Sequence, residues 1–375
     1  MKVIEIDPSD RRQARLFLDL PFKVYKDIPQ WVPPLEIDAH RMLNRRSHPF
    51  YAHSNAAFFL AMDGNGPGEV IGRLAMLDNR HFNEYNHQQT AFFYLFECLY
   101  DTEASAALFT AGEAWAKGRG LDRIYGPKGF TALDGMGLLV KGFEHRPALG
   151  IPYHPPYYAA LVEAAGFSPA GDTLSGYMHR SIQFPEKIDK VSQAVQEKRG
   201  LRIARYSKRS DLRSLVPKLR DLYNASIEGT PDNTPLTDDE ALTMADQLLW
   251  FADPRLIKIV IKDGEPVGFC FGYPDISAAL QRTKGRLFPS GWIDILLELR
   301  RTRWLNINGA GMVEKYRGLG GTAILFSEMH KSVVEGRYEH LDIVQIGADN
   351  ERMQNEMRSF GIDFYKTHRM YEKKV

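Results

Sequence analysis

Short apolar runs alternate with segments of helical periodicity along the whole chain. Leu108, Ala111 and Trp115 recur at the spacing of one helix face, and a similar set lies in 322–335. Apolar runs such as 91–100 have the length of a strand and end at polar residues. Strands that alternate with helices in this way predict an α/β protein (α+β type) with a mixed sheet.

The order of the predicted elements occurs twice. Ser9-Asp10 and Ser210-Asp211 each follow a short predicted strand and precede a predicted helix, where their side chains can cap free amides of the first turn. Asp-Gly pairs at 63–64 and 263–264 each join two apolar runs, as in a hairpin. The two Ser-Asp pairs are 201 residues apart, and the two Asp-Gly pairs are 200 residues apart. The agreement predicts a duplicated domain.

A further block of strand, helix, strand, helix and strand follows in each half. The predicted ranges are 91–100, 105–117, 121–125, 156–165 and 173–179 in the first half, and 304–313, 322–335, 341–347, 350–360 and 364–372 in the second. Gly166 and Gly361 follow the second helix of each block, where a left-handed residue commonly ends a helix. We therefore predict domains at 1–182 and 201–375, joined by a charged linker over 183–200.

Composition excludes several classes of protein. Lys plus Arg is 48 and Asp plus Glu is 47, so the net charge of +1 gives no broad positive field for nucleic acid. No apolar run reaches the roughly 20 residues of a membrane span, and the N-terminus lacks the apolar core of a signal peptide. Two cysteines and eleven histidines without metal-site spacing predict no metal. We expect a cytoplasmic protein; the oligomeric state stays open.

The segment 312–322 has the clearest chemistry. It reads MVEKYRGLGGT, after an apolar strand and before an apolar-periodic helix. A strand–glycine loop–helix unit directs free backbone amides at one point, where the helix dipole favours an anion such as pyrophosphate. Gly318 and Gly320 allow the backbone to approach a ligand closely, and Lys315 and Arg317 add positive charge. The spacing matches neither a Walker loop nor a dinucleotide fingerprint.

The pattern Lys315-x-x-Gly318-x-Gly320 resembles the acyl-CoA pyrophosphate loop of the GNAT (N-acetyltransferase) superfamily. The superfamily loop usually begins with Gln or Arg, so Lys315 departs from it while keeping the charge. The whole chain is also similar to duplicated bacterial GNAT-like proteins in the segments 72–73, 81–85, 96–98, 155–158, 166–167, 285–289 and 316–318. The resemblance implies two tandem GNAT-like domains, with acetyl-CoA or a longer acyl-CoA held between strands 304–313 and 341–347.

By this resemblance, the cofactor-binding residues are Met312, Val313, Lys315, Tyr316, Arg317, Gly318, Leu319, Gly320, Gly321, Thr322 and Asn350. The matching junction of the first half, 99–105, has no glycine and no cation. Asp101 and Glu103 there would satisfy the helix amides and repel a pyrophosphate. We therefore assign CoA binding to the second half only, as in duplicated acyltransferases such as the Fem-type enzymes.

Acyl transfer to an amine needs a polarised thioester carbonyl, a base for the amine and an acid for the leaving thiolate. Much of the superfamily uses a Tyr of the last helix as the acid, and counting from Asn350 places Met357 there. Tyr365 is the alternative acid, and Asp349 and Asp275 are candidate bases. Each aspartate is also a plausible helix cap or turn residue.

Two segments leave alternatives open. The run 154–158 either faces the cleft between the domains or starts a helix whose tyrosines pack inside. The apolar-basic segment 292–303 either contacts a phosphorylated or lipid-like substrate or a membrane surface, or packs on its own protein with its arginines in solvent. We favour the second alternative for both.

The sequence thus predicts an acyl-CoA-dependent N-acyltransferase whose acceptor, a small-molecule or peptide amine, binds between the domains. One alternative is a degenerate, non-catalytic CoA-binding protein, which the missing Tyr at 357 favours. Another is a Fem-type aminoacyl transferase, which would bind tRNA in a salt-sensitive way. The balanced charge argues against tRNA binding.

Overall fold

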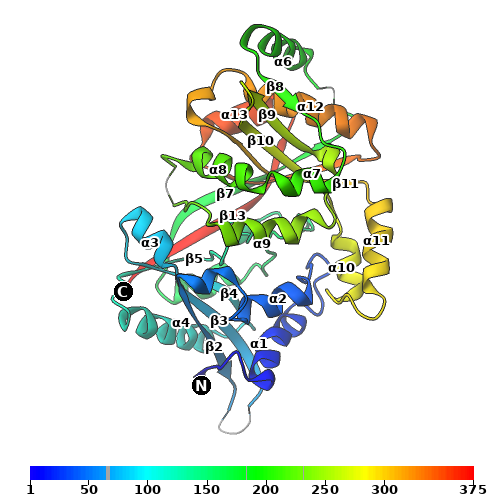
Figure 1. The fold of residues 1–375 in the computed structure, drawn as a ribbon. Helices are drawn as coiled ribbons and strands as arrows, with labels where there is room; N and C mark the ends of the chain where they lie inside the picture. The colour runs from blue at the N-terminus through cyan, green and yellow to red at the C-terminus, as the bar shows by residue number, and fades with distance from the viewer. Residues whose placement is uncertain (65–67, 183, 231) are drawn as a thin grey trace.

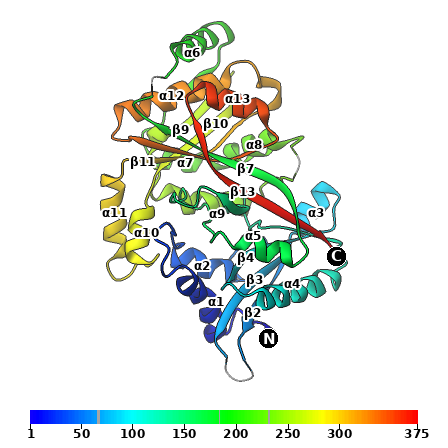
Figure 2. The ribbon, with the colours of Figure 1, turned by 180° about the vertical axis from the view of Figure 1, so that it is seen from behind.

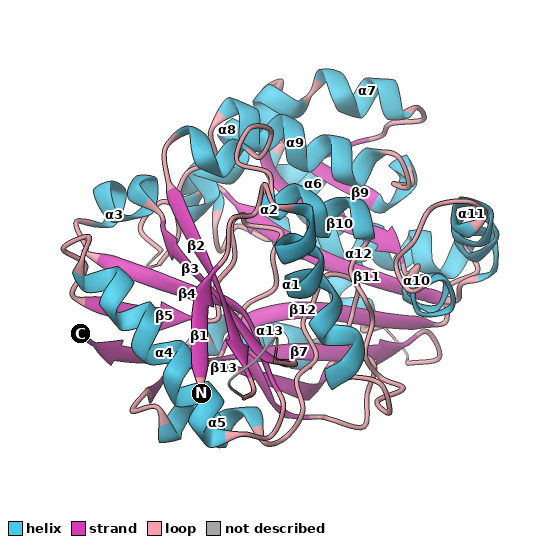
Figure 3. Cartoon of the chain, turned by 90° about the horizontal axis from the view of Figure 1, so that it is seen from below, coloured by secondary structure: helices cyan, strands magenta, loops and turns pink. Residues whose placement is uncertain are grey.

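The computed structural model of the chain describes residues 1–64, 68–182, 184–230 and 232–375. A single sheet of 13 strands, both parallel and antiparallel, extends through both repeats. Helices cover both of its faces (Figures 1 and 3). The predicted mixed α/β fold is confirmed.

The first repeat contains β1 (Lys2–Glu5), α1 (Arg11–Val24), α2 (Glu36–Leu43), β2 (Asn55–Met62), β3 (Val70–Asp78), α3 (Arg80–Asn86), β4 (Thr90–Cys98), α4 (Thr102–Lys117), β5 (Arg123–Gly126), β6 (Leu138–Lys141), α5 (Tyr158–Ala164) and β7 (Ser168–His179). A connecting helix, α6 (Glu186–Arg199), follows.

The second repeat contains β8 (Arg202–Ala204), α7 (Arg209–Ser214), α8 (Val216–Ile227), α9 (Asp238–Leu249), β9 (Ile257–Lys262), β10 (Glu265–Pro274), α10 (Ser277–Thr283), α11 (Gly291–Arg301), β11 (Trp304–Met312), α12 (Gly321–Glu335), β12 (His340–Gly347), α13 (Glu351–Ser359) and β13 (Asp363–Lys374). Short 3₁₀ turns lie at Pro49–Ala52, Pro254–Leu256 and Glu314–Tyr316. The predicted order of elements therefore occurs in both repeats.

Aspartates near the helix starts act as predicted in the first repeat and differently in the second. Asp10 caps α1 by accepting a hydrogen bond from the Arg12 amide at 2.8 Å. In the second repeat, α7 begins at Arg209, so Asp211 lies inside the first turn. Its carboxylate accepts from the Lys208 amide at 3.3 Å, a bond back to the residue before the helix. Ser210 and Asp211 therefore lie inside the first turn, and the predicted cap at these two residues is wrong.

The last strand of each repeat lies beside strands of the other repeat. The central strand order is β4-β5-β13-β7-β12-β11. Strand β13 of the second repeat pairs antiparallel with β5 of the first, and β7 of the first pairs antiparallel with β12 of the second. In Figures 1 and 2, β13 crosses the middle of the molecule towards the C-terminus at the side of the first repeat. The two repeats consequently share one sheet.

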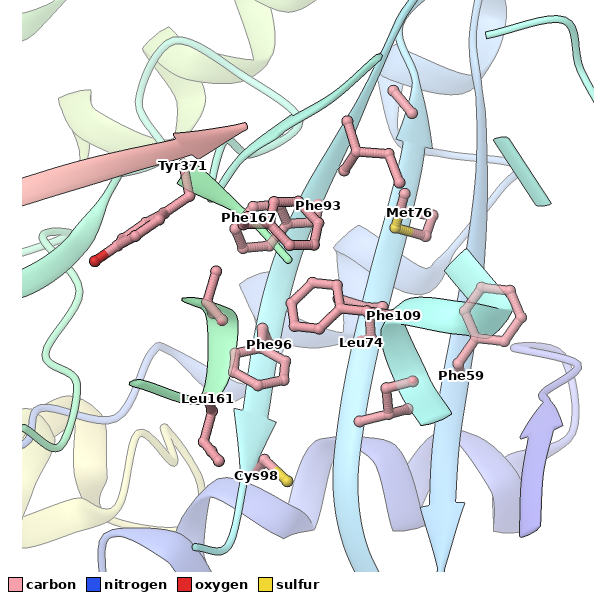
Figure 4. Close-up of a cluster of buried hydrophobic side chains, with 14 of the residues drawn as sticks. Phe59, Leu74, Met76, Phe93, Phe96, Cys98, Phe109, Leu161, Phe167 and Tyr371 are labelled. Carbon is pink, nitrogen blue, oxygen red and sulfur yellow. The ribbon is translucent and has the colours of Figure 1, made fainter. Parts of the chain in front are cut away.

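This exchange also mixes the hydrophobic cores. Tyr371 of β13 is fully buried in the first core with Phe93, Phe96 and Phe109, under α4 (Figure 4). Met178 of β7 is buried in the core of the second repeat. Each core therefore depends on a strand from the other repeat. The boundaries at 182 and 201 stay a prediction.

The predicted linker is mostly helix. Its first residue, Gln183, lies outside the described residues, as do 65–67 of the first predicted hairpin turn. In α6, Val195 is buried with the second core and Val191 packs against it. Of the helices in the described ranges, none is both long and apolar enough to cross a bilayer.

Candidate functional site

Strands β11 and β12 separate part-way along their length. They pair in parallel from Trp304 opposite His340 to Ile307 opposite Ile343, and the pairing stops there. Beyond this point β11 has a bulge, because two residues, Asn308 and Gly309, face a single residue of β10. Gly309 takes the left-handed region, with φ +95°. A bulge bends its strand and removes backbone groups from the ladder, so it opens a gap in the sheet.

A cavity of about 230 Å³ fills this gap. Its walls are 307–310 of β11, 343–346 of β12, Phe326 of α12, Met353 and Met357 of α13, and residues 132–136 and Ile151 of the first repeat. The first repeat is fastened over the gap by Gln345, whose side-chain amide bonds both the amide and the carbonyl of Met136. The cavity is therefore built by both repeats. An insertion at 127–155, the segment that connects β5 to α5 and contains β6, supplies its wall on the side of the first repeat.

Asp134 is the carboxylate in the described lining of this cavity. It accepts hydrogen bonds from the Thr131 amide at 2.8 Å and the Thr131 hydroxyl at 3.2 Å. Burial nevertheless dominates and raises the pKa of Asp134 to about 6. Sequence reasoning missed this residue. Its only signal in the sequence is its place in the Gly- and Pro-rich segment 127–155. The approach of Asp134 to β11 and β12 depends on how the two repeats meet, which the local sequence does not determine.

The glycine-rich loop leads into α12 as predicted. Gly318 and Gly320 have φ values of +73° and +89°, and residues other than glycine rarely adopt this backbone conformation. Within the described residues, the amides of Gly320, Gly321, Thr322 and Ala323 have no protein partner, and Gly320 is the N-cap of α12. These are the amides that a helix start leaves free for an anion.

The cations at this loop are arranged differently from the prediction. Arg317 donates to the carbonyls of Met312 at 3.1 Å and Ser226 at 2.7 Å, so it fastens the loop to the body of the repeat. Lys315 is exposed, with its ammonium 5.0 Å from the Tyr316 ring centroid. Arg352 of α13 also lies at the loop, and a Cβ placed on Gly318 would be 2.9 Å from its guanidinium. Sequence reasoning missed Arg352, two residues beyond Asn350.

Asn350 has a structural contact of its own. Its side-chain oxygen accepts from the Met353 amide at 3.0 Å and caps α13. Met357 is buried and lies on the cavity wall. The side chains of α13 that face the gap are thus apolar.

The connecting helix α6 packs beside the loop. A Cβ on Gly320 would come within 2.6 Å of Val195 Cγ2, and Arg199 donates to the Leu319 carbonyl at 3.1 Å. The cavity lining described above ends at Ala310 and contains no loop residue. A ligand that uses both features would have to extend from the gap to the start of α12.

The three predicted catalytic residues lie apart from the described cavity lining. Asp349 is exposed just before α13. Asp275 is buried, accepts from the Ser277 amide at 2.6 Å and lies 3.6 Å from the Arg146 guanidinium. Tyr365 donates to Asp342 Oδ2 at 2.7 Å. Their predicted roles in catalysis stay predictions.

Tyr365 belongs to a buried polar cluster next to the gap. Lys366 donates to the same Asp342 oxygen at 2.8 Å, and both partners of that ion pair are almost fully buried. Burial and the Asp342 carboxylate raise the pKa of Tyr365 far above its usual value, which makes its hydroxyl a weaker acid.

The corresponding region of the first repeat is filled by its own side chains. The Tyr158 hydroxyl accepts from the Cys98 amide at 3.0 Å and donates to Glu97 at 2.7 Å, and the Tyr157 hydroxyl donates to the Cys98 carbonyl at 2.9 Å. Asp101 caps α4 by accepting from the Ala104 amide at 2.9 Å. Of the two alternatives for 154–158, the packed one is therefore correct for Tyr158, which is fully buried.

Comparisons with known proteins agree with this architecture. No protein-family profile matches the chain. Among curated proteins, Protein YghO of Escherichia coli (strain K12) is 28% identical over 374 residues, covering 98% of this chain and 94% of that protein. A tandem GNAT protein from the clavulanic acid biosynthesis pathway, a solved structure, superposes with a TM-score of 0.58 at 11% identity, covering 100% of this chain and 98% of that one. The chain has the tandem GNAT fold.

Two further proteins extend the comparison. A GCN5-related N-acetyltransferase from Anabaena variabilis shares the GNAT fold with a TM-score of 0.54 at 10% identity, covering 99% of this chain and 72% of that one. The protein named "Bacterial ceramide synthase" of Caulobacter vibrioides (strain NA1000 / CB15N) is 26% identical over 371 residues, covering 96% of this chain and 94% of that protein. The predicted GNAT architecture is confirmed, and at these identities the structures show the fold alone.

Proposed function

We propose that the protein transfers an acyl group from acyl-CoA to an amine, with the second repeat binding the CoA. The observation that carries this proposal is the cavity between β11 and β12, which lies in the same repeat as a helix start with unpartnered amides. The free amides with Lys315 and Arg352 suit the pyrophosphate. The apolar walls of the gap suit the pantetheine arm and the acyl chain.

In this reaction the amine nitrogen attacks the thioester carbonyl carbon, the new C–N bond forms and the C–S bond breaks. Asp134 is the proposed base, because it lines the cavity and its raised pKa lies close to neutral. It accepts the proton that the amine loses, and the released thiolate takes a proton from solvent. Backbone amides freed by the bulge at Asn308 and Gly309 are the proposed donors to the carbonyl oxygen.

The acceptor we propose is a long-chain lipid amine. The support is the full-length similarity to the Caulobacter protein named as a ceramide synthase. The aliphatic and methionine side chains of the gap agree with an apolar acceptor or acyl chain. A small polar amine or a peptide amine is the alternative, and the assay below includes both.

Release of free CoA from acetyl-CoA and palmitoyl-CoA, measured with a sphingoid base, a polyamine and a lysine peptide as acceptors, tests the reaction. We expect amine-dependent release that is fastest with the sphingoid base. Binding of acyl-CoA without CoA release in the presence of any amine acceptor would favour the non-catalytic alternative. The apolar Met357 on the cavity wall supports that alternative.

Thr322→Glu tests the CoA site itself. Thr322 lies in the first turn of α12, where a carboxylate stabilises the helix but repels a pyrophosphate. We expect acyl-CoA affinity in calorimetry to fall about ten-fold or more, the effect of roughly 1.4 kcal/mol. Thr102→Glu, in the first turn of α4, is the matched control and should bind normally. Equal affinity for both variants would refute the site.

Thr322 is a better position for this test than Gly320. A side chain on Gly320 would collide with Val195 of α6 and would also require a left-handed backbone. A loss of binding in a Gly320 variant would therefore not distinguish repulsion of the ligand from altered packing of the loop.

A further inference from the structure

A two-helix projection, α10 and α11, lies at one side of the second repeat (Figures 1 and 3). The outward side of α11 exposes large apolar side chains. Trp292 and Leu296 are each 48% exposed, Ile293 is 44% exposed and Leu297 is 37% exposed. Phe288, in the loop before α11, is 80% exposed. We call these five residues, with Arg300 and Arg301, the apolar-basic face.

The inward side of α11 has its own packing. Ile295 is fully buried with Ile276, Ala279 and Leu280 of the α10 region. This small core packs against Val32, Leu35 and Leu149 of the first repeat. The favoured prediction, a helix packed on its own protein, is thus correct for one side of the helix. That packing leaves the opposite, apolar side uncovered.

The exposed cations of α11 lie at its C-terminal end, whereas its carboxylates lie further toward its start. Asp294 and Glu298 are both held by Arg282, with Asp294 Oδ1 2.9 Å and Glu298 Oε2 2.5 Å from its guanidinium. Arg300 and Arg301 are exposed and continue the rows of Trp292–Leu296 and Ile293–Leu297 by one further turn. The apolar-basic face therefore presents aromatic and aliphatic side chains followed by two cations. Its nearest carboxylates on α11 are both ion-paired with Arg282, which leaves one net negative charge in that group.

We propose that the apolar-basic face docks the protein on the surface of an anionic lipid bilayer. An aromatic and aliphatic face enters the boundary between headgroups and acyl chains, while arginines bind lipid phosphates. Anionic headgroups complement the two exposed arginines, for which the described residues show no ion pair within 4.0 Å, whereas a neutral protein surface would not. With 11 residues α11 is about 16 Å long, so it lies in the interface and does not span the bilayer.

The projection also packs against Leu149, which belongs to the segment 127–155 that supplies part of the cavity wall. Tyr273 bridges Leu149, a neighbour of the projection core, and Asn308 of the cavity lining. The Tyr273 hydroxyl donates to the Leu149 carbonyl at 3.5 Å and accepts from Asn308 at 2.8 Å. The docking proposal stands on the exposed face alone and does not require the proposed acyl transfer.

Co-sedimentation of the full chain with vesicles tests the docking. We expect binding to vesicles of phosphatidylcholine with 30% phosphatidylglycerol and much weaker binding to phosphatidylcholine alone. The double variant Arg300→Gln/Arg301→Gln should bind the anionic vesicles about 30-fold more weakly, since each cation near the surface contributes about 1 kcal/mol. Trp292→Ser/Leu296→Ser should lose at least as much, because it removes the inserted area.

Matched control variants distinguish docking through this face from non-specific binding to vesicles. Val334→Ser removes an apolar side chain of similar exposure, 47%, on α12, and Arg11→Gln removes an exposed cation from α1. Both should bind vesicles like the parent, and all variants should keep the parent melting temperature and acyl-CoA affinity. Absence of vesicle binding by the parent, or equal losses in the controls, would overturn the proposal. So would light scattering in which Trp292→Ser/Leu296→Ser turns a dimer into a monomer while the parent ignores vesicles.

Discussion

Single side chains decide what the gap between β11 and β12 can do. The pair Ile307 and Ile343 ends the strand pairing, and Gln345 fixes the first repeat over the opening. Among the lining residues, Asp134 alone offers a carboxylate, whereas Met353 and Met357 make the α13 side apolar. A partly desolvated carboxylate beside apolar walls can accept the proton that an amine loses as it attacks the thioester.

Asp134→Asn tests this assignment through pH. With a pKa of about 6, Asp134 gains its charge as pH rises through 6, so the parent kcat/KM should rise over that range and level off above pH 7. The Asn variant should lose about 100-fold in kcat/KM at pH 7.5, and this rise with pH should disappear. Asp349→Asn, at the exposed carboxylate before α13, is the matched control.

The stability of the Asp134→Asn variant provides a second readout. The folded-state pKa of Asp134 is raised above 3.8, so the folded state binds the proton more tightly than the unfolded state. This residue therefore contributes less stability as pH rises from about 4 through 6. Removing the charge should leave the melting temperature at pH 7.5 equal or higher. A variant that loses activity only by unfolding, or an inactive Asp349→Asn, would contradict the assignment.

At the scale of elements, the two strand–loop–helix junctions differ in whether a protein side chain accepts hydrogen bonds from the first amides of the helix. In β11–α12 the first turn has free amides behind two left-handed glycines, while in β4–α4 the Asp101 side chain occupies that position. The sequence predicted this difference, because capping aspartates and positive-φ glycines act within a few residues of themselves. It did not predict the role of Arg317, whose partner Ser226 lies far away in the chain.

This difference predicts the number of ligands. Calorimetry of the full chain should give one CoA per chain, since the β4–α4 junction offers no free cradle and Tyr158 fills the strand end beside it. Asp101→Gly/Glu103→Ala removes the acidic side chains from that junction and should leave the stoichiometry at one. Two equivalent sites in either protein would show that the first repeat also binds.

At the scale of the whole molecule, the exchange of β7 and β13 defines the architecture. Periodicity located β13 to within two residues at each end but placed the start of β7 five residues late. It could not assign their partners, since an antiparallel edge accepts any strand with a suitable pattern. The pairing of β13 with β5 is instead fixed by long-range packing, as for Tyr371 in the first core.

A chain that ends at residue 362 tests how far the repeats depend on one another. It lacks β13, so β5 and β7 each lose one of their two neighbouring strands. Two buried clusters of the first repeat also lose a side chain, Tyr371 from one and Met370 from the other. We expect the near-ultraviolet circular dichroism of both repeats and cooperative melting to disappear. Removal of residues 1–5 is the control, because β1 pairs only with β2 at the sheet edge, and a native spectrum should remain. Native melting of the shortened chain would show that each repeat is self-sufficient.

The position of β13 also sets the order of events during synthesis. The ribosome releases the chain from the N-terminus, so the first repeat emerges long before β13, the strand of the second repeat that belongs in its sheet. Until β13 has been made, β5 has an open edge, and the place of the Tyr371 side chain in the first core stays unfilled. The first repeat is therefore made first but completes its sheet only after β13 has been synthesised.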